Sequence, residues 1–169
     1  MLSFDIRSLI AHAAQVDGAL GHTDAVWEPG DPLPVEGVAA SGRLSAAGAE
    51  RFYWRGRIDG DALVQCRRCL TSVTVPVSEE VHLLFTTAAD DEVDDADVYR
   101  LSPRASVLDL RGAVREQWLL AVPAFAECRA ECKGLCSRCG ADRNVAPCEC
   151  LPEVDGRSAA LRGLRGGAR

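Results

Sequence analysis

The chain has 169 residues, enough for one domain with a small appendage, and 47% of them are hydrophobic, an ordinary share for a globular protein. Only 5% are aromatic, so we expect an aliphatic core. The formal net charge of −6 repels nucleic acid at long range, so any contact with RNA has to come from a local basic patch.

The amino-terminal sequence predicts a cytoplasmic protein. Residues 1–7 (MLSFDIR) contain neither the basic region nor the apolar region of a secretion signal. No apolar run approaches the roughly 18 residues of a membrane span, so we expect no membrane contact. In the reducing cytosol, eight cysteines indicate metal or redox chemistry rather than a disulfide framework.

The first half of the chain predicts a helix, a loop and then strands. Residues 5–15 have apolar side chains at helical spacing, whereas residues 17–34 are rich in Gly, Pro and Asp and predict a loop. Short extended segments follow at residues 35–44, 51–58, 62–65, 73–77 and 81–85. We interpret them as an antiparallel β meander, either an open sheet or a partly closed barrel, with Asp59-Gly60-Asp61 as a turn.

An acidic stretch separates these strands from the next helix. Residues 90–97 contain six acidic side chains in eight positions and predict a solvated loop. An alternative is a docking surface for a basic partner such as a ribosomal protein. A calcium loop is disfavoured because the glycine and the distal glutamate of an EF-hand are missing.

The strongest helix pattern covers residues 106–121. Ser106 is the expected N-cap, and Asp109 stands where a capping box has Glu or Gln. The apolar positions at helical spacing are Leu110, Val114, Trp118 and Ala121. Pro123 ends the helix. We expect the apolar stripe of this amphipathic helix to pack on the sheet, which makes the fold class α+β.

The last part of the chain contains a compact set of four cysteines. The spacing Cys136-x2-Cys139 lets two thiolates reach one zinc ion, and Gly140 supplies the positive φ that closes such a turn. Cys148 and Cys150 return after a short loop, and four thiolates select Zn(II) over magnesium or calcium. We call these four residues the C-terminal set and predict a zinc site there; an iron–sulfur cluster or redox use is the alternative.

The other four cysteines are far apart in the sequence. We call Cys66, Cys69, Cys128 and Cys132 the long-range set, and predict a second zinc site that clamps the strand region to the segment after the helix. The pattern leaves the partition open, because Cys132 can instead join the C-terminal set. The expected cofactor is therefore Zn(2+), one or two ions per chain.

The pair Cys66 and Cys69 is also compatible with a thiol oxidoreductase that uses these two thiols. A redox pair favours a first cysteine at a helix N-terminus, whereas this pair lies between two predicted strands. Arg67 and Arg68 would lower the pKa of the thiols, but they would equally offset the charge of a four-thiolate zinc site. We therefore favour zinc over redox chemistry for this pair.

No other residue pattern predicts catalysis. The histidines are scattered without a ligand-type partner nearby and are His12, His22 and His82. The sequence contains no P-loop, nucleophile elbow or dinucleotide-binding fingerprint. We therefore predict a protein that is not an enzyme.

The stretch CKGLCSRCGADRN at residues 132–144, followed by Cys148-Glu-Cys150, resembles the C-terminal motif of the YceD family, the large ribosomal RNA subunit accumulation proteins. Earlier features occur in the order of that family, and they are CRRCL at 66–70, the acidic stretch, LDL at 108–110 and EQWLLAVP at 116–123. The sequence departs from the family at Asp142-Arg143, where members often have a small polar residue and an aliphatic one.

The resemblance implies a non-catalytic role in accumulation or processing of 23S rRNA and in ribosome assembly. The implied partner is a large-subunit ribosomal protein, an assembly factor or a pre-ribosomal particle. Direct contact with rRNA is the alternative, and the basic residues that would touch phosphate are Arg129, Lys133, Arg138, Arg143 and those of the arginine-containing tail. A nuclease is disfavoured because no acid–base pair or open metal site is present.

These observations divide the chain into three parts. We expect an α+β domain over residues 1–125 and a zinc-binding module over residues 126–152 that packs on it. Residues 153–169, rich in Arg and Gly, are expected to form a flexible tail.

Overall fold

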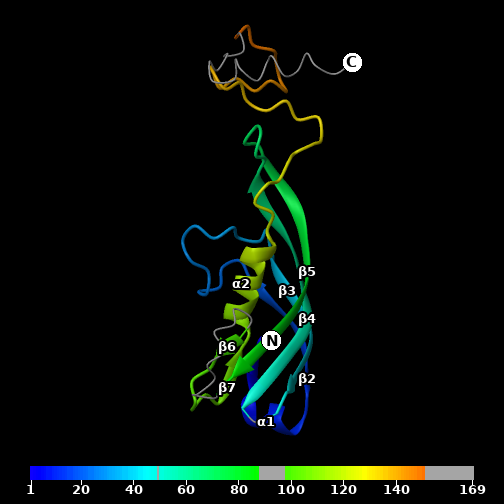
Figure 1. Ribbon diagram of the computed structural model, residues 1–169, viewed down its shortest axis with the longest axis vertical. Helices are drawn as coiled ribbons and strands as arrows, with labels where there is room; N and C mark the ends of the chain where they lie inside the picture. The colour runs from blue at the N-terminus through cyan, green and yellow to red at the C-terminus, as the bar shows by residue number, and fades with distance from the viewer. Residues whose placement is uncertain (49, 88–97, 151–169) are drawn as a thin grey trace, which may run out of the picture.

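Alternation of buried and exposed side chains builds the five strands of the main sheet in the computed structural model, which describes residues 1–48, 50–87 and 98–150. The strand order is β2-β3-β4-β5-β6; the first four strands are antiparallel, and β6 runs parallel to β5. The strands are β2 (Ala14–Gly21), β3 (Gly37–Ala46), β4 (Arg51–Gln65), β5 (Ser72–Thr86) and β6 (Val98–Arg100). The α+β class is confirmed, but the described strands form an open sheet and close no barrel (Figure 1).

The amino terminus differs from the expectation. The helix α1 (Ile6–Ala11) ends well before residue 15, and its N-cap Asp5 accepts the backbone N–H of Ser8 at 2.8 Å. The segment β2 is a strand where a loop was predicted, because Val16 and Leu20 alternate into the core.

Gly18 within β2 has a packing role rather than a turn role. A Cβ at this position would lie 2.5 Å from the amino nitrogen of Met1. That amino group donates a hydrogen bond to the carbonyl oxygen of Asp17 at 2.8 Å. The glycine therefore allows the chain start to lie against the strand.

Strands β4 and β5 form one long hairpin. They pair over their whole length, from Arg51 opposite Thr86 to Gln65 opposite Ser72. The predicted turn at Asp59-Gly60-Asp61 is wrong, because these residues continue β4. A Cβ on Gly60 would lie 3.0 Å from the ring of Trp118, so the glycine makes room for that ring and does not turn the chain.

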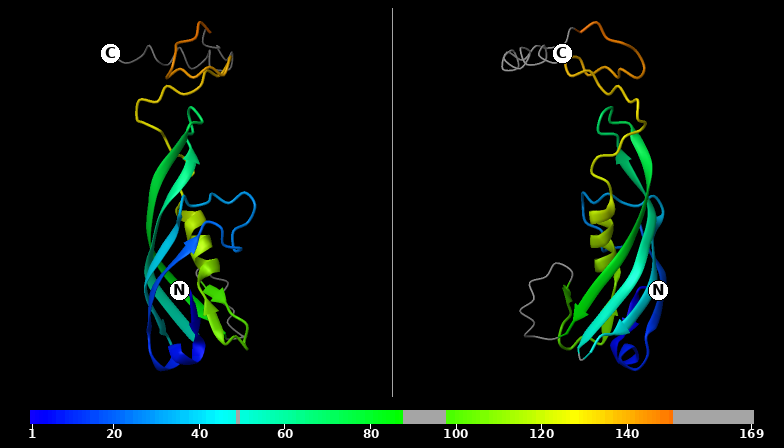
Figure 2. Two further views of the ribbon diagram at one scale, coloured as in Figure 1. Left: turned by 180° about the vertical axis from the view of Figure 1, so that it is seen from behind. Right: turned by 45° about the vertical axis from the view of Figure 1, so that its right-hand side comes forward.

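The second helix covers one face of the sheet. Helix α2 (Arg111–Ala121) contacts β2, β3, β4 and β5, and its Val114 and Trp118 are fully buried (Figures 1 and 2). Packing of the predicted amphipathic helix on the sheet is thus confirmed. The indole N–H of Trp118 donates to the carbonyl oxygen of Pro32, which fixes the loop before β3 against the helix.

Helix α2 begins at Arg111, five residues after the start that the sequence predicts. Residues 107–109 form β7 (Val107–Asp109), which pairs with β1 (Ser3–Asp5) in a small antiparallel sheet. The carbonyl of Ser106 accepts the backbone N–H of Ile6 at 2.9 Å, so this residue joins the chain start instead of capping the helix. The N-cap residue of α2 is Leu110, which has no capping side chain, but Oδ1 of Asp109 accepts the backbone N–H of Arg111 at 3.0 Å.

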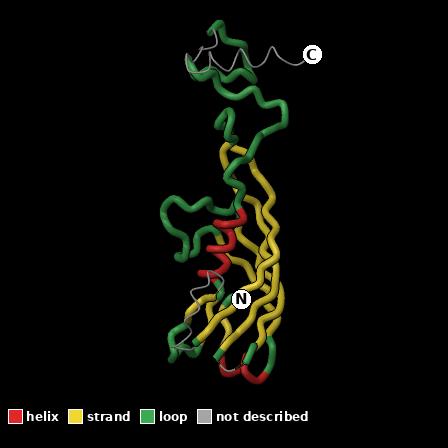
Figure 3. Tube along the Cα trace, viewed as in Figure 1, coloured by secondary structure: helices red, strands yellow, loops and turns green. Residues whose placement is uncertain are grey.

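The molecule is elongated, with the hairpin of β4 and β5 reaching past α2 (Figures 1 and 2). The cysteine-rich residues 126–150 lie at that end, and α1 lies at the other end. Figure 3 shows that residues 126–150 form neither helix nor strand.

The acidic stretch at 90–97 and the predicted tail at 153–169 lie outside the described residues. Neither described helix is long and apolar enough to cross a membrane.

Candidate metal centres

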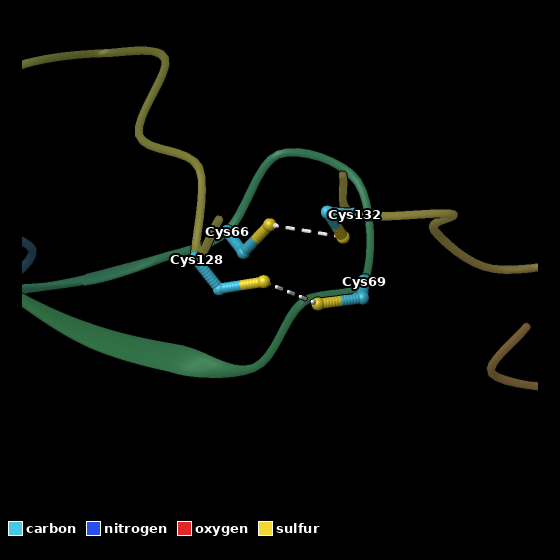
Figure 4. A group of neighbouring side chains, drawn as sticks. All are labelled: Cys66, Cys69, Cys128 and Cys132. Carbon is cyan, nitrogen blue, oxygen red and sulfur yellow. Dashed lines mark hydrogen bonds between the residues drawn. The ribbon is translucent and has the colours of Figure 1, made fainter. Parts of the chain in front are cut away.

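The tip of the β4–β5 hairpin folds into a tight turn around two cysteines. The backbone N–H of Leu70 donates to the carbonyl oxygen of Cys66 at 2.9 Å, and the N–H of Cys66 donates to the carbonyl oxygen of Thr71 at 2.9 Å. Closing this turn requires a left-handed backbone at Leu70, whose φ is +62°. The turn directs the sulfur atoms of Cys66 and Cys69 toward the same point (Figure 4).

The segment after α2 supplies the two partner cysteines. The carbonyl oxygen of Ala126 accepts the backbone N–H of Arg67 at 2.9 Å, beside Cys128. The guanidinium group of Arg68 donates to the carbonyl oxygen of Cys132 at 2.9 Å. These hydrogen bonds bring residues about 60 positions apart in the sequence to the hairpin tip.

Arg67 and Arg68 both pair with the carboxylate of Glu127, the latter at 3.4 Å. Their observed role is to hold the segment after α2 against the hairpin. A direct ion pair to the thiolates is not among their described contacts, and the pKa of Cys66 is lowered chiefly by backbone N–H groups, that of Arg68 among them.

The geometry of the long-range set fits a tetrahedral zinc ion. The sulfur atoms of Cys66 and Cys132 are 3.9 Å apart, and those of Cys69 and Cys128 are 3.7 Å apart (Figure 4). Zn–S bonds of about 2.3 Å in a tetrahedron place sulfur atoms about 3.8 Å apart. A disulfide requires about 2.05 Å, and all eight cysteines are free. All four sulfur atoms of the set lie within 4.8 Å of one another.

The thiols of the long-range set differ in acidity. Backbone N–H groups of Cys69, Arg68 and Cys128 hydrogen-bond to the sulfur of Cys66 and lower its pKa to about 6. The hydroxyl of Thr71, 3.4 Å from Cys69 Sγ, lowers the pKa of Cys69. Burial, followed by the neighbouring thiol of Cys132, raises the pKa of Cys128 to about 12. A cation that binds all four thiolates must therefore displace at least one strongly held proton.

The C-terminal set repeats the same turn. The backbone N–H of Gly140 donates to the carbonyl oxygen of Cys136 at 2.9 Å. The N–H of Cys136 donates to the carbonyl oxygen of Ala141 at 2.8 Å. Gly140 has φ +71°, the conformation that Leu70 has in the first turn. We call each such turn a knuckle.

The electrostatics of the second knuckle match those of the first. Backbone N–H groups of Cys139 and Arg138 lower the pKa of Cys136 to about 6. A hydrogen bond with the Cys139 thiol, followed by burial, raises the pKa of Cys150 to about 12. The four sulfur atoms of this set also lie within 4.8 Å of one another. Cys139 and Cys150 are exposed, whereas three members of the long-range set are buried.

The structure brings the eight cysteines together in the two predicted sets of four, with Cys132 in the long-range set. Both donor sets are chemically suited to zinc, and the N–H groups aimed at Cys66 and Cys136 stabilise bound thiolates. That these residues bind zinc stays a prediction.

Sequence reasoning missed a residue that connects the two sets. The side-chain amide of Asn144 lies 3.5 Å from the sulfur of Cys132, and its oxygen accepts the backbone N–H of Lys133 at 2.8 Å. Asp142 orients Asn144 by accepting both its backbone N–H and its side-chain N–H, at 2.8 and 2.7 Å. Asp142, where the sequence departs from the family, thus helps to place the Asn144 amide beside the sulfur of Cys132. The signal available in the sequence was the asparagine of the motif itself.

The other residues that the sequence singled out lie outside the two sets. His82 contacts Tyr53, and His22 contacts the carbonyl oxygen of Glu36. The four basic residues proposed to touch rRNA are all exposed and lie along the cysteine-rich segment, at Arg129, Lys133, Arg138 and Arg143. Their contact with RNA stays a prediction.

Comparison with known proteins identifies the family. A family model described as "Large ribosomal RNA subunit accumulation protein YceD" matches residues 54–165. Mb2951c of Mycobacterium bovis and Rv2926c of Mycobacterium tuberculosis, both described as uncharacterized, are each 28% identical over 109 residues, which is 63% of this chain and 52% of the relative. The chain therefore spans about half the length of the curated relatives it matches, and no solved structure matches it. Because the family model covers more than half of the chain, the chain belongs to the YceD family.

Proposed function

We propose that this protein is a non-catalytic factor for 23S rRNA accumulation and large-subunit assembly, stabilised by two zinc ions and acting through a protein or ribonucleoprotein partner. The observation that carries the proposal is the YceD family match over residues 54–165. The family is named for accumulation of the large ribosomal RNA.

The two cysteine sets support a structural rather than a catalytic role for metal. Each set offers four thiolates to one ion, and a zinc ion with four protein ligands keeps no open position for water or substrate. Among the described residues, no other group of three His, Cys, Asp or Glu side chains converges on a possible ion. When bound, zinc supplies cross-links, and this chain supplies the N–H groups that stabilise the thiolates.

Thiol oxidoreductase activity is the second candidate, and the lowered pKa of Cys66 favours it. A reactive thiolate also has to be accessible. Cys66 is fully buried, and its sulfur lies among three other sulfur atoms. Accessibility therefore favours metal binding over thiol exchange.

The metal part is tested by native mass spectrometry of protein purified without added metal. We expect two zinc ions per chain and no disulfides. Cys136→Ser should lose one ion, whereas the neighbouring control Ser137→Ala should keep both. Protein without zinc, or with disulfides in both sets, would contradict the metal assignment.

The biological part is tested by deleting the gene and measuring the ratio of 23S to 16S rRNA. We expect the ratio to fall and to be restored by the wild-type gene. An unchanged ratio would overturn the proposed function whatever the metal content. A zinc-free chain that catalyses thiol–disulfide exchange through Cys66 would establish the second candidate.

A further inference from the structure

The face of the main sheet that points away from α2 carries exposed basic side chains in register. One row across the strands contains Gln15, Arg43, Arg55 and His82. The next row contains Asp17, Ser41, Arg57 and Glu80. All eight side chains are exposed. The first row is basic, and the two rows together carry three arginines and two carboxylates, a formal charge of +1 on a chain whose net charge is −6.

Arg43 and Arg55 are directly opposite each other on β3 and β4. Like charges at directly opposed positions destabilise an antiparallel pair. Within the part of the chain that the structure describes, neither guanidinium group forms a hydrogen bond or an ion pair. Arg57 comes no closer than 3.9 Å to Glu80, and both side chains are more than half exposed. Folding alone gives no reason for this arrangement.

A shallow hollow of about 390 Å³ lies between these arginines. Its walls include Arg43, Arg55 and Arg57 together with Glu80, and Gly42 and Gly56 form part of its lining. A Cβ at Gly56 would lie 2.1 Å from a backbone oxygen of β3, so close strand packing keeps this position a glycine. The hollow is open to an extended ligand lying across the strands.

Two rings stand beside the arginine pair. Tyr53 precedes Arg55 by two positions on the same face of β4, and His82 is the cross-strand partner of Arg55. The hydroxyl of Tyr53 lies 2.7 Å from Nδ1 of His82, and the ring centroids are 6.2 Å apart. Tyr53 is 36% exposed, so part of its ring is available for a flat ligand group.

We infer that this surface binds single-stranded RNA, with the arginines on backbone phosphates and the Tyr53–His82 pair against a base. We call it the arginine face and define it as Arg43, Arg55, Arg57, Tyr53 and His82. A phosphate accepts paired hydrogen bonds from guanidinium groups and removes their mutual repulsion. Sheet surfaces that combine aromatic rings with basic side chains bind single strands in this manner.

The choice of RNA over an acidic protein segment rests on the proposed function and on the rings. A carboxylate-rich peptide would neutralise the arginines but would leave the ring pair without a stacking partner. The arginine face is also separate from the basic residues of the cysteine-rich segment, so the two surfaces can be tested independently.

The test is fluorescence anisotropy with a labelled oligouridine of about 12 nucleotides, a length within the site sizes of single-strand-binding sheets. We expect Arg43→Gln with Arg55→Gln to weaken binding about tenfold or more near 0.1 M salt. The slope of log affinity against log salt should fall in magnitude by about 1.4, since two phosphate contacts are lost. Tyr53→Ala should weaken binding about fivefold or more through lost stacking.

Two controls make the result specific. Arg7→Gln with Arg104→Gln removes the same charge from α1 and from the loop after β6, and should leave binding unchanged. The arginine-face double variant should melt at or above the wild-type temperature, because it removes a like-charge pair. A purely structural role for these arginines would lower the melting temperature instead.

Several outcomes overturn the inference. They are no RNA binding by the wild-type chain, equal binding by the arginine-face variant, an equal loss in the control variant, and tighter binding of a polyglutamate peptide at the same arginines. In the deletion strain, normal 23S rRNA with the arginine-face variant would refute the inference and leave the proposed function standing. A deletion without any rRNA defect would refute the proposed function alone.

Discussion

Loss of the long-range set should destabilise the folded core, and Cys66→Ser tests this. The zinc ion would tie Cys69 to Cys128, which are 59 positions apart, and the closed loop contains β5, β6, β7 and α2. A cross-link across this loop reduces the entropy of the unfolded chain. Removing it therefore favours unfolding of the sheet and of the helix packed on it.

The C-terminal set gives the matched comparison. It closes only the nine positions from Cys139 to Cys148, outside the sheet and α2. With a loop entropy that scales as 1.5RT times the logarithm of length, the long-range set contributes about 1.7 kcal/mol more. For a chain of this size the difference corresponds to about 3–7 °C in melting temperature.

Calorimetry combined with native mass spectrometry measures both effects. Cys66→Ser and Cys136→Ser should each lose one zinc ion, but only the former should lower the main melting transition by about this margin. If Cys136→Ser lowered the main transition as much as Cys66→Ser, the loop-closure reasoning would be wrong. If Cys66→Ser kept two zinc ions, the ligand assignment itself would fail.

Three further predictions concern single side chains. Asn144→Ala removes an N–H aimed at a sulfur of the long-range set, so a chelator should extract one zinc ion faster, and unchanged extraction would exclude that role. Gly134 has φ +68°, and a Cβ added there would lie 2.8 Å from the carbonyl oxygen of Arg68 in the first knuckle. Gly134→Ala should therefore lower the free energy of unfolding by at least about 1 kcal/mol in denaturant titrations. Wild-type stability of this variant would contradict the backbone argument. A side-chain hydrogen bond from Arg115 lowers the pKa of Asp31 in the folded protein. The ionised carboxylate therefore stabilises the fold fully above the unfolded-state pKa near 4. This stabilisation is lost as the pH falls through the lower pKa of the folded state. Asp31→Asn should flatten that acid-side loss in pH-dependent melting, and an unchanged profile would refute the assignment.

The sequence predicts the fold best where periodicity is unambiguous. The apolar positions Val114 and Trp118 correctly place α2 on the sheet. Glycine misled the prediction elsewhere, because Gly18 and Gly60 lie inside strands to admit the chain start and an indole ring. Such close approaches depend on residues far away in the sequence, so local turn signals cannot distinguish them from loops.

Prediction of the candidate site from the sequence also succeeds for local turns and fails for long-range contacts. The C-x2-C spacing identifies both knuckles, since each knuckle is a local turn. The assignment of Cys132 to the long-range set depends on the carbonyl that Arg68 binds, and this contact forms only in the folded chain. The first knuckle has Leu70 at the position that Gly140 occupies in the second, so the sequence does not mark its left-handed backbone conformation.

We expect the order of the hairpin tip to depend on the long-range set. The main hydrophobic core ends near Ala62 and Val77, and the separate buried cluster beyond it contains Cys66, Cys69 and Cys132. Leu63, between the two, is 57% exposed. Beyond the partly buried Val64 and Val75, little apolar packing holds the tip, so we expect the proposed zinc ion to order it.

Hydrogen exchange measures this dependence. After chelation, amides of residues 63–75 should exchange faster, whereas those of residues 39–46 and 52–58, where β3 and β4 pair, should stay protected. The contrast follows from packing, since Leu44, Trp54 and Ile58 lie fully buried in the main core. Equal loss of protection in both segments would show that the hairpin unfolds as one unit, and that the metal stabilises the whole sheet rather than its tip.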